Sequence, residues 1–239
     1  MNKPFKFKQF TIHQDKCAMK IGTDGVLLGA WTSIENTPNS ILDIGTGTGI
    51  IALQLAQRSD AIIIDAIEID DSAYEQAVEN FENSDWGDRL FCYHASLQEF
   101  SQEIDEKYNL IISNPPFYND KFETDNISRN RARFTSSLSF KNLLSFVSKL
   151  LSENGTFSVI IPFKEEQNFI DLAKKNNLFL NRICRVKGNK FSEIKRSLIA
   201  LSFLRSKTKI EELTIEIERH QYTNEYVNLV KGFYLKMDT

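Results

Sequence analysis

The sequence lacks several features that would place the protein in a specialised class. Its 239 residues include three cysteines, which lie far apart and form no C-x-x-C pair, so neither a disulfide framework nor a structural zinc site is indicated. No stretch reaches the ~20 apolar residues that span a bilayer, and the amino terminus has no apolar run of signal-peptide type. Internal repeats are also missing. These absences favour a soluble, cytoplasmic protein that holds no metal.

The charge is distributed unevenly, although the net charge is only −3. Residues 41–106 contain fifteen acidic and two basic side chains, whereas residues 182–209 contain nine basic side chains and one acidic one. Most charges on any protein are simply part of its solvated surface. An acidic region beside basic segments would nevertheless suit a cationic cofactor next to a polyanion.

From residue 41 onward, short β-branched runs alternate with longer helical periods, which is typical of β-α-β units and a largely parallel sheet. Helices are predicted at 49–58, 71–84, 140–151 and 164–176, and seven strands at 41–45, 61–69, 89–95, 108–113, 155–161, 179–186 and 197–204. The loop 187–196 is too short for a helical crossover, so the last two strands should form an antiparallel hairpin at one edge of the sheet. A further strand and a closing helix are expected in the tail.

Three glycines, Gly45, Gly47 and Gly49, alternate directly after the first of these strands. Glycine allows a sharp turn and lets a ligand approach the backbone amides. The dinucleotide fingerprint G-x-G-x-x-G is not met, because Ile50 stands at its third glycine position, and Asp43 would oppose a pyrophosphate. The turn therefore indicates a ligand site but disfavours a nicotinamide cofactor.

The G-x-G-x-G spacing with an acid two residues earlier resembles the first motif of class I S-adenosylmethionine-dependent methyltransferases. This resemblance implies a Rossmann-like α/β fold and S-adenosyl-L-methionine, whose cationic groups suit the acidic region. Glu68, at the end of the second strand, can accept hydrogen bonds from both ribose hydroxyls. At the end of the third strand, Ser96 stands where relatives commonly have Asp, so it would be a weaker acceptor for the adenine amine.

Asn114, Pro115, Pro116 and Phe117 follow the apolar strand at 108–113. Adjacent prolines alone would only terminate a strand, but a terminator requires neither the Asn before them nor the aromatic residue after them. The tetrapeptide resembles the N-P-P-[YF] motif of methyltransferases that act on amino groups conjugated to a ring or an amide. The carbonyls of the Asn114 side chain and the Pro115 backbone can accept the two amine hydrogens, while Phe117 stacks on the base. We predict that these four residues are catalytic.

The amino-terminal stretch at 5–31 is more distinctive, and it resembles the bacterial tRNA1(Val) (adenine-37-N6)-methyltransferase family. The likeness extends through 43–49, Glu68, 114–117, 132–135 and 226–235. It implies methylation of the adenine next to the anticodon of one valine tRNA, with Lys20, Thr23 and Asp24 near the mouth of the cofactor site. The residues predicted to bind the cofactor are Lys20, Thr23, Asp43, Gly45, Thr46, Gly47, Glu68, Ile69, Ser96, Leu97 and Asn114.

Basic residues around the predicted site indicate how tRNA would be held. The polar stretch at 118–137 follows the catalytic tetrapeptide, and long loops inside compact domains usually bind ligands or cover sites. The hairpin loop at 187–196 carries a second basic group. The residues predicted to bind RNA phosphates are Arg129, Arg131, Arg133, Lys187, Lys190, Lys195 and Arg196. No metal and no obligate protein partner is inferred.

Two alternatives stay open at the level of the sequence. An rRNA guanine-N2 methyltransferase can use the same tetrapeptide, and a catalytically silent RNA-binding module can share the scaffold. We expect one methyltransferase domain over 1–239, with a Rossmann-like core at 41–239 and an amino-terminal extension at 1–40 that packs near the cofactor site. Only forty residues precede the core, which argues against the large helical domain of protein-glutamine methyltransferases.

Overall fold

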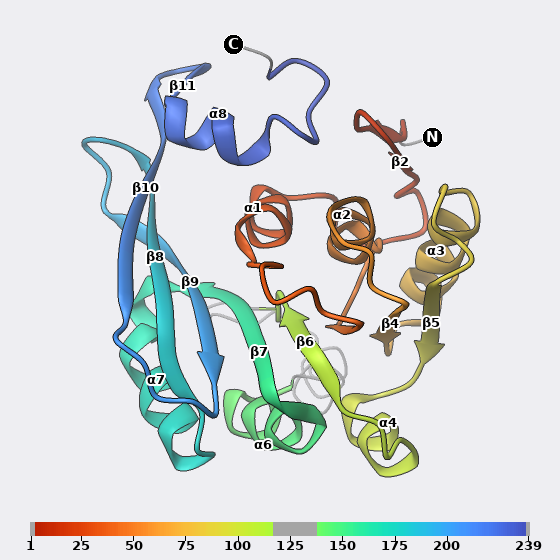
Figure 1. The fold of residues 1–239 in the computed structure, drawn as a ribbon. Helices are drawn as coiled ribbons and strands as arrows, with labels where there is room; N and C mark the ends of the chain where they lie inside the picture. The colour runs from red at the N-terminus through yellow and green to blue at the C-terminus, as the bar shows by residue number, and fades with distance from the viewer. Residues whose placement is uncertain (1–2, 117–137, 238–239) are drawn as a thin grey trace, which may run out of the picture.

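The computed structural model of the protein describes residues 3–116 and 138–237 (Figure 1). In this part of the chain, nine strands form one sheet in the order β11-β10-β8-β9-β7-β6-β3-β4-β5, and β1 and β2 form a separate two-stranded sheet. The strands are β1 (Phe5–Lys6), β2 (Thr11–Ile12), β3 (Ser40–Ile44), β4 (Ile63–Glu68), β5 (Leu90–His94), β6 (Tyr108–Ser113), β7 (Leu151–Pro162), β8 (Phe179–Asn189), β9 (Ile194–Ser202), β10 (Lys209–Glu218) and β11 (Gln221–Tyr222).

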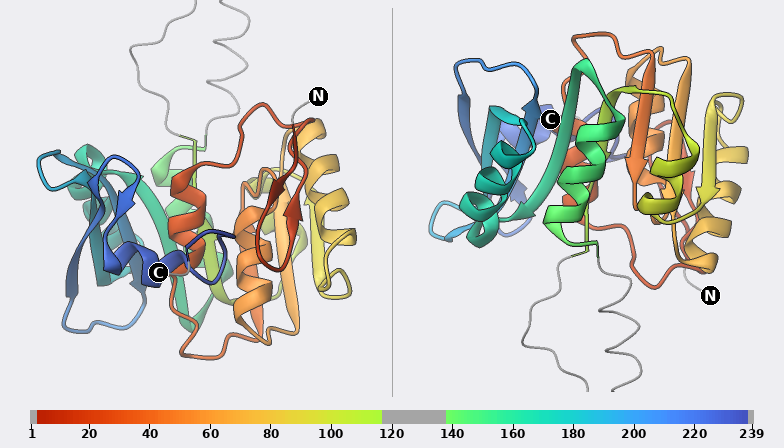
Figure 2. Two further views of the ribbon diagram at one scale, coloured as in Figure 1. Left: turned by 90° about the horizontal axis from the view of Figure 1, so that it is seen from above. Right: turned by 90° about the horizontal axis from the view of Figure 1, so that it is seen from below.

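Helices connect most of these strands and cover both faces of the large sheet. They are α1 (Thr23–Trp31), α2 (Ile50–Arg58), α3 (Asp71–Glu82), α4 (Leu97–Glu103), α6 (Phe140–Leu150), a 3-10 turn η1 (Phe163–Glu165), α7 (Glu166–Lys175) and α8 (Asn224–Val230). The buried side chains of α1, α2, α3 and α8 belong to one apolar cluster, and those of α4, α6 and α7 belong to the other. Figure 2 shows these two helical layers from opposite sides.

The predicted α/β fold with a mostly parallel sheet is confirmed, and each of the seven predicted strands is present. Strands β5, β4, β3, β6 and β7 are mutually parallel, and β8 and β9 form the predicted antiparallel hairpin. The predicted position of the hairpin was wrong, because β10 pairs in parallel with β8 and β11 follows it, so the hairpin lies inside a nine-stranded sheet.

The burial of β9 explains why the hairpin is internal. Four consecutive residues, Leu198, Ile199, Ala200 and Leu201, are all buried, although alternate side chains of a strand point to opposite faces. A strand that is apolar on both faces needs covering layers on both sides and a neighbour along each edge. Here β9 hydrogen-bonds to β7 on one edge and β8 on the other.

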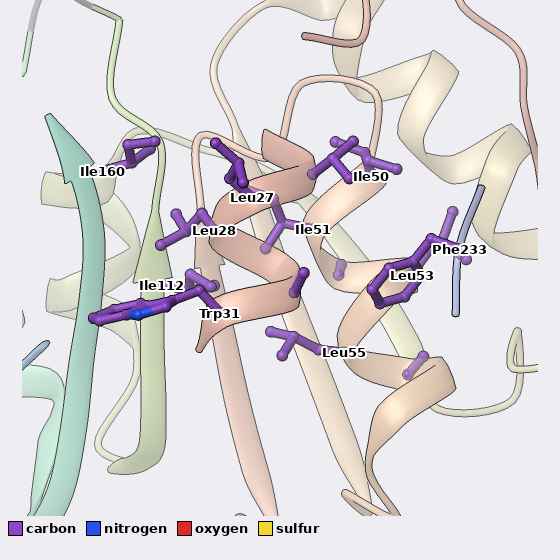
Figure 3. Packing of buried hydrophobic residues seen from close by; sticks show 14 of the residues in the cluster. Leu27, Leu28, Trp31, Ile50, Ile51, Leu53, Leu55, Ile112, Ile160 and Phe233 are labelled. Carbon is purple, nitrogen blue, oxygen red and sulfur yellow. The ribbon is translucent and has the colours of Figure 1, made fainter. Parts of the chain in front are cut away.

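Helix α1 was not predicted, because its sequence shows no amphipathic period. Residues 25–31 are all buried, so the helix is apolar all round and packs between α2 and the sheet (Figure 3). Gly29 allows the close approach of α2, since a Cβ there would lie 2.3 Å from Gln54 Oε1. The Gln54 amide in turn donates to the Val26 carbonyl at 3.1 Å.

Candidate active site

The carboxyl ends of the central parallel strands bring the main predicted residues to one edge of the sheet. Ile44 of β3 is paired with Ile67 of β4 and with Ser113 of β6, and the Ser113 hydroxyl donates to the Ile44 carbonyl at 2.9 Å. The next residues along these strands are Gly45, Glu68 and Asn114. Ligands of doubly wound sheets bind at this edge.

The glycine turn between β3 and α2 has a backbone that requires glycine. Gly45, Gly47 and Gly49 have φ angles of 69°, 58° and 81°, all in the left-handed region. A Cβ on Gly49 would lie 2.5 Å from the Phe81 ring, so this glycine allows α3 to pack closely. A Cβ on Gly45 or Gly47 would meet no atom within 4 Å. These two glycines therefore face open space, which leaves room for a ligand.

Glu68 is fixed beside this turn by three backbone amides. Its Oε2 accepts a hydrogen bond from Gly47 N at 2.9 Å, and its Oε1 accepts from Ile69 N at 2.9 Å and Asp70 N at 3.0 Å. Hydrogen bonds of this kind restrict the orientation of a carboxylate. The structure thus holds a negative charge in a defined position at the end of β4.

Asp43 is fully buried beneath the turn. The Thr46 hydroxyl donates to its Oδ2 at 2.6 Å. Burial raises the pKa of Asp43 to about 7, although the hydrogen bonds from Thr46 and from the Ala52 backbone oppose that rise. A cationic ligand near this carboxyl would stabilise its charged form, so the site is suited electrostatically to a cation.

Ser96 caps helix α4, and this role uses the hydroxyl that the sequence assigned to the cofactor. Its Oγ accepts from Glu99 N at 3.2 Å and its backbone N donates to Glu99 Oε2 at 3.0 Å, which together form a capping box, and the Oγ also donates to Glu99 Oε2 at 2.7 Å. Leu97, which follows, is buried, and Ile69 at the end of β4 is 53% exposed. The Ser96 hydroxyl is therefore less available to the adenine amine of the cofactor than the sequence suggests.

The segment before α1 is fixed to α3 by a residue that the sequence analysis missed. Asn80, which is 1% exposed, accepts from His13 N at 2.8 Å and donates to the carbonyls of His13 at 2.9 Å and Thr48 at 2.8 Å. One turn earlier, Gln76 accepts from Lys16 N at 3.0 Å. Asn80 therefore joins the amino-terminal segment to the glycine turn. Its place among apolar residues of α3 is the only sequence signal that we find for it.

Lys20 and Thr23 lie in the same amino-terminal region. The ammonium of Lys20 donates to the carbonyls of Gln14 and Cys17, the latter at 3.1 Å, so it stabilises its own segment. Thr23 is exposed at the first turn of α1. The assignment of Lys20 and Thr23 to the cofactor site therefore stays a prediction.

Helix α1 reaches the residue predicted to be catalytic. A Cβ placed on Gly25 would lie 3.4 Å from Ile50 Cγ2 and 3.9 Å from Asn114 Nδ2. The amino-terminal turn of α1, the start of α2 and the residue after β6 therefore meet at one point. Asn114 is partly buried there, and Pro115 after it is buried.

Two of the predicted RNA-binding side chains on the β8–β9 hairpin already form ion pairs. Lys187 Nζ lies 2.7 Å from Glu212 of β10, and Arg196 Nε lies 2.7 Å from Asp24 of α1. Lys190 lies over the ring of its neighbour Phe191, 4.8 Å from the centroid. Lys195 is exposed. Four other predicted site residues lie outside the described residues: Phe117, Arg129, Arg131 and Arg133.

Among the described residues, no group of three or more His, Cys, Asp or Glu side chains is arranged to hold a metal ion. None of the helices in 3–116 and 138–237 combines the length and apolar character needed to cross a bilayer.

This combination of a doubly wound sheet, a glycine turn after β3 and an acid at the end of β4 defines a class I methyltransferase, whose cofactor is S-adenosyl-L-methionine. Solved structures support the fold: a predicted O-methyltransferase from Agrobacterium tumefaciens has a TM-score of 0.68 at 17% identity, with coverage of 88% of this chain and 96% of that chain. M. jannaschii TYW2 in complex with AdoMet has a TM-score of 0.54 at 15% identity, and 83% of each chain is covered.

Sequence comparisons are more specific. Residues 22–138 match the model of the methyltransferase small domain. The chain is 62% identical to the tRNA1(Val) (adenine(37)-N6)-methyltransferase of Christiangramia forsetii, over 99% of both chains. It is 46% identical to the Bacteroides fragilis protein of the same name, over 99% of this chain and 100% of that one. The chain belongs to the tRNA1(Val) (adenine(37)-N6)-methyltransferase family.

Proposed function

We propose that the protein methylates N6 of adenine 37 in tRNA1(Val). The observation that carries this proposal is the near-full-length similarity to relatives of that name, together with an Asn-Pro-Pro sequence after β6. An unpaired anticodon-loop base can be extruded at low cost, because no base pair has to be broken. A compact catalytic domain then suffices for the reaction.

The cofactor would be held at the carboxyl ends of β3, β4 and β5. Gly45 and Gly47 have room beside them for close approach of a ligand, and the fixed carboxylate of Glu68 can accept hydrogen bonds from the ribose hydroxyls. Asp43 contributes negative potential near the cationic groups. We assign the walls of this site to Thr46, Ile69, Ser96 and Leu97, and its mouth to Lys20 and Thr23.

The chemistry depends on holding an unreactive amine in the correct orientation. The lone pair of adenine N6 is delocalised into the ring, so the amine must be turned before it can attack. The Asn114 side-chain carbonyl and the Pro115 backbone carbonyl would accept its two hydrogens. The bound cofactor supplies the methyl group. As the amine acquires positive charge, the same carbonyls stabilise it, and the methylated amine, now strongly acidic, then loses its extra proton to water, so no dedicated general base is needed. Pro116 restrains the turn, and Phe117 would stack on the base.

The tRNA would meet the end of the sheet that carries the β8–β9 hairpin. Lys190 and Lys195 are the best-supported hairpin contacts, because Lys187 and Arg196 are already paired with Glu212 and Asp24. Release of counterions by lysine–phosphate contacts would supply a sequence-independent part of the affinity. We keep Arg129, Arg131 and Arg133 as further phosphate contacts.

The chain would act in the cytoplasm as one methyltransferase domain over 1–239, with residues 1–40 forming part of the cofactor site. The contacts of Asn80 with His13 and Thr48 support a place for residues 1–40 in the cofactor site, because they join the amino-terminal segment to the glycine turn. The alternative of an rRNA guanine-N2 methyltransferase has less support, since the relatives with near-full-length similarity are named for tRNA. The presence of both Asn114 and the glycine turn argues against a silent module.

The deciding experiment is a methyl-transfer assay with defined RNA. The purified protein is incubated with labelled S-adenosyl-L-methionine and unmodified tRNA1(Val), and the modified nucleoside is identified by mass spectrometry. We expect N6-methyladenosine at position 37 and no product with a transcript that carries guanine there. Transfer to purified rRNA but not to tRNA would support the alternative enzyme.

A further inference from the structure

The tip of the β8–β9 hairpin presents an aromatic side chain to solvent. Phe191 is 86% exposed, more than any other large apolar side chain in the part of the chain that the structure describes. One exposed apolar residue is ordinary by itself. This one differs because of the turn that holds it, the charges beside it and the place where the hairpin is attached.

The turn that carries Phe191 is held by a set of short hydrogen bonds. The Asn189 side-chain oxygen accepts from Phe191 N at 2.9 Å and from Ser192 N at 3.0 Å, and the Ser192 hydroxyl accepts from Asn189 N at 2.8 Å. Side-chain to backbone bonds of this kind fix the conformation of a turn. The aromatic ring is therefore presented by an ordered turn.

The surroundings of the ring are basic. The Lys190 ammonium lies 4.8 Å from the ring centroid, and the large exposed fraction leaves most of the ring open to solvent. Lys195 is exposed on the following strand, and Glu193 is the only acid within 187–196. Aromatic side chains interleaved with lysines are the combination that binds single-stranded nucleic acid, because the bases stack while the phosphates are neutralised.

The hairpin is attached next to the proposed catalytic residue. Arg196 is ion-paired with Asp24 in the first turn of α1, and Gly25 of that turn is the glycine whose Cβ would lie 3.9 Å from Asn114 Nδ2. Phe191 lies five positions before Arg196, so the two α-carbons are at most about 17 Å apart. The ring is therefore at the same end of the sheet as the proposed site, and a single-stranded RNA segment can extend from Asn114 past Arg196 to the hairpin tip.

We propose that Phe191 stacks on a second unpaired base of the tRNA substrate, other than the adenine that is methylated, while Lys190 contacts the adjoining phosphate. This inference rests on the proposed function for the identity of the RNA. It adds a second contact to an unpaired base, so that the loop is held at two points. The extruded adenine would then be one end of a short segment whose other end is fixed by the hairpin tip.

The test compares variants that change only the ring. Phe191→Ala should weaken binding of unmodified tRNA1(Val) about 5- to 150-fold, whereas Phe191→Trp should retain near-wild-type affinity, since stacking tolerates any flat aromatic group. Because the side chain is exposed, we expect both variants to fold and to bind S-adenosyl-L-methionine normally. Leu204→Ala is the matched control, because Leu204 is also exposed but follows β9 at its far end from the hairpin.

An abasic scan of the anticodon loop identifies the partner base. At one position other than 37, removal of the base should weaken binding to the wild type but not to Phe191→Ala, because that variant has no ring to stack on the base. Equal affinity of the wild type and Phe191→Ala, or a shift of Phe191→Ala from dimer to monomer in light scattering, would overturn the proposal. Failure of the wild type to methylate tRNA1(Val) would instead count against the proposed function.

Discussion

Asn114 is the residue on which the proposed chemistry depends most directly. Asn114→Ala removes the side-chain carbonyl that would hold the amine and stabilise its developing charge. We expect kcat to fall by roughly a hundredfold or more, with cofactor affinity changed by no more than about threefold, as for a contact made mainly in the transition state. Steady-state kinetics with tRNA and calorimetry with the cofactor measure the two quantities separately. Full activity of the variant would exclude the mechanism.

Glu68 tests the cofactor site itself. Glu68→Ala removes the charged acceptor at the end of β4 and leaves the amides of Gly47 and Ile69 without their partner. We expect affinity for S-adenosyl-L-methionine to fall by about 1 to 3 kcal/mol. Glu75→Ala serves as the control, because that side chain is exposed on α3. If both variants bound the cofactor like the wild type, Glu68 would not lie in the ribose site.

Asp43 should make stability depend on pH. Burial raises its pKa from 3.8 to about 7 in the folded protein, so between these values the folded state binds more protons than the unfolded state. The contribution of Asp43 to the free energy of unfolding therefore decreases as the pH rises through this interval. Asp43→Asn replaces the titratable carboxyl group by an amide, whose oxygen can still accept a hydrogen bond from the Thr46 hydroxyl.

Urea unfolding of both proteins at pH 5 and pH 8 checks this expectation. The free energy of unfolding of the wild type minus that of Asp43→Asn should be larger at pH 5 than at pH 8. At pH 8, addition of S-adenosyl-L-methionine should raise the stability of the wild type relative to Asp43→Asn, since a nearby cation favours the charged carboxylate. A stability difference that is the same at both pH values would mean that Asp43 does not titrate in this range.

At the scale of the element, the contribution of the contacts between α3 and the amino-terminal segment can be measured by removing Asn80. Asn80→Ala leaves the buried carbonyl of Thr48 and the backbone groups of His13 without their partner. We expect the free energy of unfolding to fall by about 1 to 3 kcal/mol and cofactor affinity to fall with it, because the glycine turn loses a support. Urea unfolding and calorimetry measure the two effects.

Asn83→Ala is the matched control for Asn80→Ala. Asn83 lies at the end of the same helix, and its side chain is exposed and bonds only to the Glu79 carbonyl. Its replacement should change stability by less than about 0.5 kcal/mol. Equal effects of the two substitutions would show that Asn80 has no special role in joining the segment to the turn.

Local motifs of the sequence indicated the residues of the proposed site but not the contacts that support them. Gly45 and Asn114 were predicted because turn chemistry and a tetrapeptide are visible in a few consecutive residues, and the structure brings both to the same edge of the sheet. Asn80 was missed because its partners, His13 and Thr48, lie 67 and 32 positions away, and only packing brings them together. The pairing of the Ser96 hydroxyl with Glu99 depends on α4 beginning at Leu97, which the predicted helices did not include.

The elements show the same division. The seven strands were predicted from short apolar runs, whereas α1 was missed because a helix that is buried all round has no polar face to mark its period. The position of the hairpin was predicted wrongly, although the four consecutive apolar residues at 198–201 are typical of an internal strand. Pairing of β10 with β8 is a long-range choice that local pattern does not determine.

At the scale of the whole molecule, the lysines of the basic segment 182–209 lie at two opposite ends of strands β8, β9 and β10. Lys190 and Lys195 are at the hairpin end, next to the proposed site. Lys207 and Lys209 lie at the other end of the same strands, where Lys209 is opposite Arg182 in the parallel register. The two pairs carry the same charge, so they allow position to be tested at constant net charge.

Reversing Lys190 and Lys195 to Glu should weaken tRNA binding and flatten its salt dependence by about one unit of slope for each lysine–phosphate pair that the reversal removes. Reversing Lys207 and Lys209 to Glu changes the net charge equally and should leave the slope near the wild-type value, because a long-range effect of net charge is screened beyond about 10 Å in 0.1 M salt. Filter binding across a salt series measures both variants, and calorimetry confirms that cofactor binding is retained. Equal flattening of the slope in the two variants would mean that net charge, and not the hairpin end of the sheet, determines how the tRNA is held.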